Sequence, residues 1–357
     1  MTWTWDELLA AFGAVGGVAE NVVLRSGPYG RGLYPRRPGQ PVRLFAPPNL
    51  LFKVDEMEFV DGRLTLKPDA QVTERERAFF DGYHESFGWN GGGRADCEAF
   101  LQRLAAVPAG LREAVNNELM MEGFFEGEKA VPNRAESRFL GTRKIRRREH
   151  MVLMPVLELI NHTSTGPLMD LKNGAELSGE FADEIRFRYA VTDALGVFTS
   201  WGFASDEVLA YSLPLTFRFQ QRTVVVNRQT AKAVKGGQFQ TPSVKIEDGA
   251  TVLSHVLLGH RSYPKLAKTQ FYAAMRELPD IDAETIFDTI AHHNRLRYLR
   301  VLDLLEDRPG DMVNALRRMA RYQLNAMSYA LGERADPAAA EAAKTGESEA
   351  AVAAEEP

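Results

Sequence analysis

The chain has 357 residues, of which 45% are hydrophobic and 25% charged, the composition of a soluble globular protein with room for two domains. The net charge of −5 comes from residues 333–357, which contain seven acidic and two basic residues. The remainder of the chain is therefore neutral and lacks the basic face that nucleic-acid binding needs. The single cysteine, Cys97, excludes an internal disulfide and a multi-cysteine zinc site, which suits a cytoplasmic protein.

Two further features bear on the compartment. No apolar run approaches the roughly 18 residues that cross a membrane. The first residues, among them Trp3, Trp5 and Asp6, lack the basic start and apolar stretch of a signal peptide. We therefore expect a cytoplasmic protein that binds no membrane.

The first 70 residues predict one helix followed by short strands. Thr4 can cap a helix with an apolar face, which Gly16-Gly17 would end. Residues 27–33 hold several glycines after a strand, typical of an ordinary turn or of a backbone that approaches a ligand closely. The strands are expected over residues 22–24 and 42–46, and a hairpin over residues 57–66 turns at Asp61-Gly62.

The middle of the chain changes from helical to β character. Helical spacing of apolar residues covers 73–80, 96–106 and 109–121, and Asn90–Gly93 resembles a flexible link without the Lys-Ser/Thr of a phosphate loop. Arg143–Arg148 is a basic run, either a solvated loop or a contact for an acidic partner surface. Strand character returns over 151–156 and 184–189, with a polar loop over 163–179 between them.

The last third is predicted to be mostly helical. We expect strands over 216–226 and 243–246 around a turn at Lys235–Gly237, and helices from Lys265 onward. The final helix has an apolar face that includes Leu316, Met319 and Met327. Residues 335–357 are rich in Ala and Glu without apolar periodicity, so we predict a disordered tail.

Asn161-His162 ends an apolar segment that begins at Met151. Burial is predicted for this segment, and an unsatisfied buried polar group costs about 1–3 kcal/mol, so the pair must bond to backbone or to a ligand. A capped segment end with a satisfied core histidine and a ligand site are both compatible with this pattern. His292 and His293 are adjacent on a predicted helix and point to different faces, so we expect no metal site.

The order of several motifs resembles the SET-domain methyltransferases. Tyr29-Gly30-Arg31-Gly32 is followed by Asn161-His162, then Tyr189, then Gly202-Phe203. The resemblance is to the Rubisco large-subunit lysine methyltransferase-like branch, which includes the actin-histidine methyltransferase. It covers residues 1–205 well and residues 206–332 in outline.

This resemblance implies an α+β fold in three parts. A SET domain of short β-sheets with a pseudoknot would occupy residues 1–205, with a helical insertion at about 70–140. A mostly helical C-terminal domain that binds the substrate would occupy residues 206–332, and a disordered acidic tail residues 333–357. The implied activity is transfer of a methyl group from S-adenosyl-L-methionine to a lysine side chain of a protein substrate, by an enzyme that we expect to be a monomer.

The resemblance also assigns roles to residues of this chain. Tyr189 would be the catalytic tyrosine. The cofactor would be bound by a larger set: Tyr29, Gly30, Arg31, Gly32, Arg138, Glu158, Asn161, His162, Gly202 and Phe203. No residue is implied as a metal ligand.

Two departures from the family pattern leave alternatives open. Glu158 stands where the family often has Asp, and Ala190 and Asp193-Ala194 replace the glycine and Ser-Asn that follow the tyrosine. The alternatives are a SET-fold binding or scaffold protein with little activity, and a methyltransferase that acts on histidine or on a small molecule.

Overall fold

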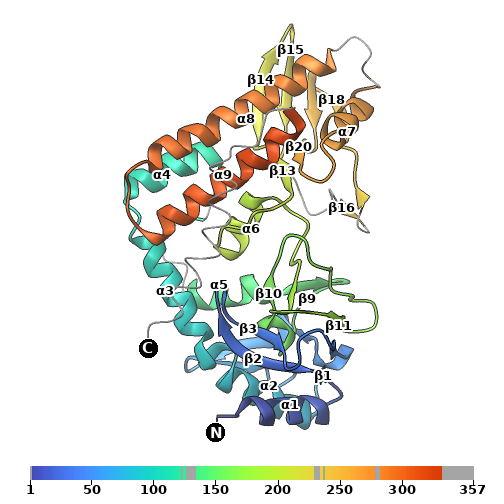
Figure 1. Ribbon diagram of the computed structural model, residues 1–357. Helices are drawn as coiled ribbons and strands as arrows, with labels where there is room; N and C mark the ends of the chain where they lie inside the picture. Colours follow the sequence, from blue (N-terminus) through green and yellow to red (C-terminus); the bar gives the residue numbers. More distant parts are fainter. Residues whose placement is uncertain are drawn as a thin grey trace. The chain divides into compact units, whose positions relative to one another are not determined.

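The computed structural model describes residues 2–121, 124–125, 134–228, 234–235, 238–276, 278 and 282–331 (Figure 1). The predicted tail over 333–357 and the glycines of the predicted turn at 235–237 lie outside the described residues. Contacts divide the described chain into two compact units. The N-terminal unit comprises residues 2–102 and 134–189, and the C-terminal unit comprises 103–121, 124–125 and the described residues from 190 to 331.

The N-terminal unit begins with a helix whose first turn is closed by its own side chains. Thr4 caps α1 (Trp5–Ala14): its hydroxyl accepts from the Glu7 backbone N–H, and the Glu7 carboxylate accepts from the Thr4 backbone N–H at 2.7 Å. Thr73 and Glu76 form the same reciprocal pair at the start of α2 (Glu74–Ser86). Both predicted helix starts are confirmed.

Short strands form several small sheets in this unit. β1 (Val18–Glu20), β4 (Pro41–Ala46) and β11 (Ala175–Glu180) make one three-stranded sheet, and β5 (Phe52–Lys53), β9 (His150–Leu153) and β8 (Ile145–Arg147) make another. β2 (Val22–Gly27) pairs with β3 (Gly30–Pro35), and β6 (Met57–Val60) pairs with β7 (Arg63–Leu66). Asp61 and Gly62 both have positive φ, as a two-residue hairpin turn requires, so the predicted hairpin is confirmed.

The predicted link at Asn90–Gly93 lies between two helices, as expected. It belongs to η3 (Trp89–Gly93), a wide turn in which Gly91 and Gly92 have non-helical φ and ψ, and it leads directly into α3 (Arg94–Ala105). The predicted polar loop ends early, because β11 starts at Ala175 and pairs with β4 over six positions. Gly174, with φ +138°, allows the chain to enter this strand close to Phe45.

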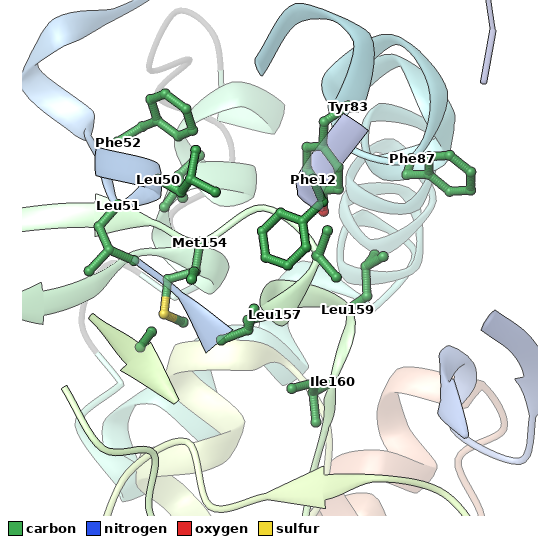
Figure 2. Packing of buried hydrophobic residues seen from close by; sticks show 14 of the residues in the cluster. Phe12, Leu50, Leu51, Phe52, Tyr83, Phe87, Met154, Leu157, Leu159 and Ile160 are labelled. Carbon is green, nitrogen blue, oxygen red and sulfur yellow. The ribbon is translucent and has the colours of Figure 1, made fainter. Parts of the chain in front are cut away.

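The apolar segment before Asn161 lies in the core, as predicted. Figure 2 shows Met154, Leu157, Leu159 and Ile160 among the buried side chains of the core cluster that also contains Phe12. The 3-10 turns η1 (Pro48–Leu50), η2 (Val54–Glu56) and η4 (Leu157–Leu159) connect the short strands. The remaining elements of the unit are α5 (Arg134–Arg143), β10 (Asn161–His162) and β12 (Arg186–Phe187).

The C-terminal unit combines a sheet with long helices. Its four-stranded sheet has the order β14 (Leu215–Phe219), β15 (Arg222–Val226), β19 (Ala250–Leu253) and β18 (Val244–Glu247). The single strand predicted over 216–226 is a hairpin instead, because Gln220 adopts φ +53° and reverses the chain. Short pairs join β13 (Leu209–Tyr211) to β20 (Leu257–His260) and β16 (Val234–Lys235) to β17 (Gln238–Phe239).

The helices of this unit are α4 (Ala109–Leu119), α6 (Ala194–Trp201), α7 (Leu266–Met275), α8 (Ala283–Leu305) and α9 (Asp311–Leu331). α4 packs against α8, where Arg297 donates to the Asn117 carbonyl at 2.9 Å and Glu118 lies 3.4 Å from Arg300 (Figure 1). No helix in the described part of the chain is long and apolar enough to span a membrane.

Candidate functional site

A parallel strand pair places the predicted Asn-His pair beside the segment that leads to Tyr189. In β10 and β12, Asn161 lies opposite Arg186 and His162 lies opposite Phe187. Thr163 extends the pairing, because its N–H donates to the Phe187 carbonyl at 3.1 Å. Two segments that are well separated in the sequence are therefore held side by side in the N-terminal unit.

Asn161 reaches across to the predicted glycine pair. Its amide Nδ2 donates to Glu184 Oε1 at 2.6 Å and lies 3.4 Å from the Arg31 carbonyl oxygen. A Cβ at Gly32 would lie 2.6 Å from Asn161 Nδ2 and 2.2 Å from Glu184 Oε1, so a side chain there would displace this pair. The turn predicted within residues 27–33 is confirmed, because Pro28-Tyr29 form the turn of the β2–β3 hairpin. The close approach at Gly32 is to the side chains of Asn161 and Glu184, and the approach of this backbone to a ligand stays a prediction.

Asn161 and Glu184 together present oxygen acceptors. The amide nitrogen faces a carboxylate and a carbonyl, which assigns Nδ2 to that side and leaves Oδ1 as an acceptor for other donors. Glu184 is only 7% exposed, and burial raises the pKa of its carboxyl while the Asn161 hydrogen bond lowers it. A buried carboxylate beside an amide oxygen suits a cationic amine. The sequence motifs did not single out Glu184.

Tyr189 is held from both ends. Its backbone N–H donates to His162 Nδ1 at 3.2 Å, and its hydroxyl donates to the Ile160 carbonyl at 2.8 Å. The rings of His162 and Tyr189 lie 5.1 Å apart. Burial raises the pKa of Tyr189, so the hydroxyl keeps its proton at neutral pH. Because that proton is directed at Ile160, the oxygen can act as an acceptor towards a further group.

Glu158 is a buried carboxylate in the same unit. Its side chain is 1% exposed, Oε1 accepts from the Tyr83 hydroxyl at 3.0 Å, and Arg143 Nε lies 3.8 Å from Oε1. Burial raises the pKa of Glu158, while Arg143 and Tyr83 oppose that shift. Oε2 is buried and has no hydrogen-bond partner among the described residues. The sequence indicated Arg143 only as part of a basic run.

The backbone that leads into this region is strained. Val156 adopts φ +73° and ψ −53° although its side chain is β-branched and fully buried. A non-glycine residue in such a region costs on the order of 1–3 kcal/mol. The strained residue directly precedes η4, which carries Glu158 and leads to Asn161.

Three further residues that the resemblance assigns to the cofactor, Tyr29, Gly30 and Arg31, lie on the β2–β3 hairpin and differ in exposure and contacts. Tyr29 is 49% exposed, and the Arg186 guanidinium lies 5.1 Å from the centre of its ring. Arg31 donates to the Phe87 and Gly91 carbonyls, so its guanidinium holds the end of α2, while its own carbonyl faces Asn161. Gly30 has φ +86° and open space around it.

Arg138 stacks on an aromatic ring. It lies on α5 with its guanidinium 3.2 Å from the centre of the Phe100 ring. Such stacking on an aromatic face is a cation–π contact. Arg143, further along the same helix, is the arginine that lies beside Glu158.

Gly202 and Phe203 belong to the C-terminal unit. Gly202 ends α6 in the left-handed conformation, with φ +84°, and its N–H donates to the Phe198 carbonyl at 2.8 Å. Phe203 follows and is 37% exposed. In the described residues, no cluster of three or more His, Cys, Asp or Glu side chains could hold a metal ion.

Comparisons with known proteins find matches among solved structures. No protein-family model matches the sequence, and no curated protein matches it. Among solved structures, the chain is similar to a crystal structure of the SET domain of LSMT bound to lysine and AdoHcy, with 12% sequence identity and a TM-score of 0.37. The similarity covers 96% of this chain and 93% of that one.

Proposed function

We propose that this chain is a SET-type methyltransferase that uses S-adenosyl-L-methionine to methylate a lysine side chain of a protein substrate. The observation that carries the proposal is the cluster in which Asn161 contacts the Arg31 backbone beside Gly32 while Tyr189 is anchored on Ile160. Motifs that are about 130 residues apart in the sequence meet there, which supports the proposal.

The residues of the cluster fit the polar end of the cofactor. Asn161 Oδ1 and the Glu184 carboxylate would accept from the ammonium of its amino-acid part, and the open backbone at Gly30 admits a ligand without a clash. Arg143 would face the cofactor carboxylate from α5, or Arg138 would do so as the motif match implies. When bound, S-adenosyl-L-methionine supplies an electrophilic methyl group on a sulfonium.

Tyr189 would orient the acceptor amine. A substrate amine N–H can donate to the Tyr189 oxygen, which turns the nitrogen lone pair towards the methyl group. The raised pKa of Tyr189 excludes a phenolate base at neutral pH. The amine would instead lose its proton because desolvation near a sulfonium cation lowers its pKa.

We also propose that the substrate is a protein, that the enzyme is a monomer and that it is located in the cytoplasm. The C-terminal unit would contribute the substrate-binding surface, and the local basic segment Lys144–Arg148 would favour an acidic region near the target lysine. Methylation of histidine or of a small molecule, and a scaffold without activity, are the outcomes that the test must separate.

Titration calorimetry with S-adenosyl-L-methionine tests the cofactor site. We expect Asn161→Ala to weaken binding by about 1–3 kcal/mol, because the variant removes one acceptor and leaves Glu184 without its donor. Asn90→Ala, an exposed asparagine of the same unit, should bind as the wild type does. Wild-type protein that binds no S-adenosyl-L-methionine would refute the proposal.

Labelled cofactor then tests the acceptor. Incubation of the protein with methyl-labelled S-adenosyl-L-methionine and a cell lysate, followed by mass spectrometry, should find the label on lysine side chains of protein. Label on histidine or in small molecules would replace the proposed acceptor class. Cofactor binding without any labelled product would identify a scaffold.

A further inference from the structure

Three segments of the C-terminal unit converge on one buried carboxylate. Asp193 is 5% exposed, and its Oδ1 accepts from the Gly196 N–H at 2.8 Å, which caps α6. Its Oδ2 accepts from the Tyr211 N–H of β13 at 3.1 Å and from Gln323 Nε2 of α9 at 2.8 Å. Burial raises the pKa of Asp193 and these hydrogen bonds lower it, so the carboxylate depends on its donors.

Gln323 interrupts an otherwise apolar face. It is completely buried on α9 among Met319, Ala320 and Met327. A buried amide without partners would destabilise the unit, and Gln323 Nε2 has its short bond to Asp193 and a longer one of 3.4 Å to the Tyr211 carbonyl. Gln323, the polar residue on this apolar face, is therefore stabilised there by its hydrogen bond to Asp193.

The position of α9 is itself fixed by packing. A Cβ at Gly259 would lie 2.0 Å from the Ala326 carbonyl oxygen, so the helix lies directly on the backbone of β20. β20 pairs with β13, which supplies the Tyr211 N–H to Asp193. The partner of Asp193 on α9 is thus held in place independently of Asp193.

α6 needs such an anchor more than the longer helices do. It has 8 residues, and isolated helices of this length are unstable in water. Asp193 supplies its N-terminal cap, and its C-terminal end is Gly202, followed by Phe203. The orientation of Gly202-Phe203 therefore follows from how α6 is held.

We propose that Asp193 and Gln323 are positioning residues through which α9 fixes α6 and thereby Gly202-Phe203. The C-terminal helix then determines the geometry of the residue pair that the motif match assigns to the cofactor. The anchoring of α6 stands on the structure alone, and its effect on cofactor binding rests on the proposed function.

Hydrogen exchange read by mass spectrometry tests the anchoring. Gln323→Met keeps the length and apolar packing of the side chain but removes the donor. We expect the backbone amides of 194–203 to exchange at least ten times faster than in the wild type. Leu316→Val on the same helix, a buried change without a hydrogen bond, should leave their exchange within twofold of wild type after matching for thermal stability.

Asp193→Asn separates capping from the contact with α9. The asparagine keeps an oxygen for the Gly196 N–H but presents an NH2 group to Gln323 and Tyr211. The proposal expects faster exchange of 194–203 here too, by tenfold or more. Wild-type exchange of this segment in both variants, or an equal increase in Leu316→Val, would overturn it.

Calorimetry tests the consequence for the site. Gln323→Met should bind S-adenosyl-L-methionine about three- to tenfold more weakly than Leu316→Val does. If the wild type binds no cofactor, the proposed function fails while the exchange result still decides the anchoring. If exchange rises and cofactor affinity is unchanged, Gln323 anchors α6 without positioning Gly202-Phe203, and that part of the proposal is wrong.

Discussion

At the scale of single residues, hydrogen-bond direction limits what each candidate side chain can do. Tyr189 donates its hydroxyl proton to the Ile160 carbonyl, so in the proposed function it would orient an amine as an acceptor. Asn161 donates its amide protons to the Glu184 carboxylate and the Arg31 carbonyl, which leaves its oxygen as the acceptor for the proposed cofactor. The sequence resemblance points to these two residues but does not give the direction of their hydrogen bonds.

Tyr189→Phe tests the acceptor role. The ring and its packing remain, so cofactor affinity should hold, and stability should fall by only about 1 kcal/mol for the lost bond to Ile160. If the hydroxyl acts mainly in the transition state, kcat and kcat/KM should fall together by ~10- to 1,000-fold. Single-turnover rates and thermal melts of the same protein give both quantities. Tyr272→Phe on α7 should keep wild-type rates, and unchanged turnover in Tyr189→Phe would assign the positioning to backbone groups.

At the scale of elements, close backbone approach decides where glycine is needed. α9 meets β20 at Gly259, where any side chain would collide with the helix backbone at Ala326 and Met327. Gly110, in the first turn of α4, has open space where a Cβ would lie, with no atom within 4 Å. Replacement of glycine by alanine should therefore lower the stability of the C-terminal unit at Gly259 and raise it at Gly110.

Gly259→Ala should destabilise the C-terminal unit by about 1–3 kcal/mol, the usual cost of forcing extra atoms into a packed contact. Gly110→Ala should stabilise it by roughly 0.4–1 kcal/mol, since alanine reduces the freedom of the unfolded chain. Urea unfolding followed by circular dichroism measures both changes. Equal stability of the two variants would show that α9 moves away from β20 at little cost.

At the scale of the whole molecule, buried titratable groups link stability to pH. His84 is 2% exposed, its Nε2 has no partner among the described residues, and burial lowers its pKa to about 3. The folded state therefore favours the neutral form of His84. The contribution of this residue to the free energy of unfolding is fully present above the unfolded pKa of about 6.5, and it is lost as the pH falls from there towards the folded pKa.

His84→Gln should make the N-terminal unit less sensitive to acid. Between pH 7.5 and pH 5 the wild type should lose about 2 kcal/mol more of its free energy of unfolding than the variant does, since each unit below 6.5 costs about 1.36 kcal/mol. Urea unfolding at both pH values measures this difference. The prediction fails if both proteins lose the same amount.

The compact units of the structure are not continuous stretches of the sequence. We predicted a domain boundary between residues 205 and 206, and this boundary stays a prediction. Contacts group 103–121 with the C-terminal unit, where Glu118 of α4 lies close to Arg297 and Arg300 of α8. Such pairing between distant parts of the sequence depends on tertiary packing, which local composition does not encode.

Local chemistry determined much of the fold from the sequence alone. Thr4 and Thr73 mark helix starts, Asp61-Gly62 marks a hairpin, and the apolar run before Asn161 lies in the core, because caps, turns and burial act over a few neighbouring residues. Only the tertiary structure decided that Glu184 meets Asn161, that Arg143 lies beside Glu158, and that Gln323 donates a hydrogen bond to Asp193. Each of these pairs joins groups distant in sequence, and a buried polar group takes the partner that the surrounding packing brings to it.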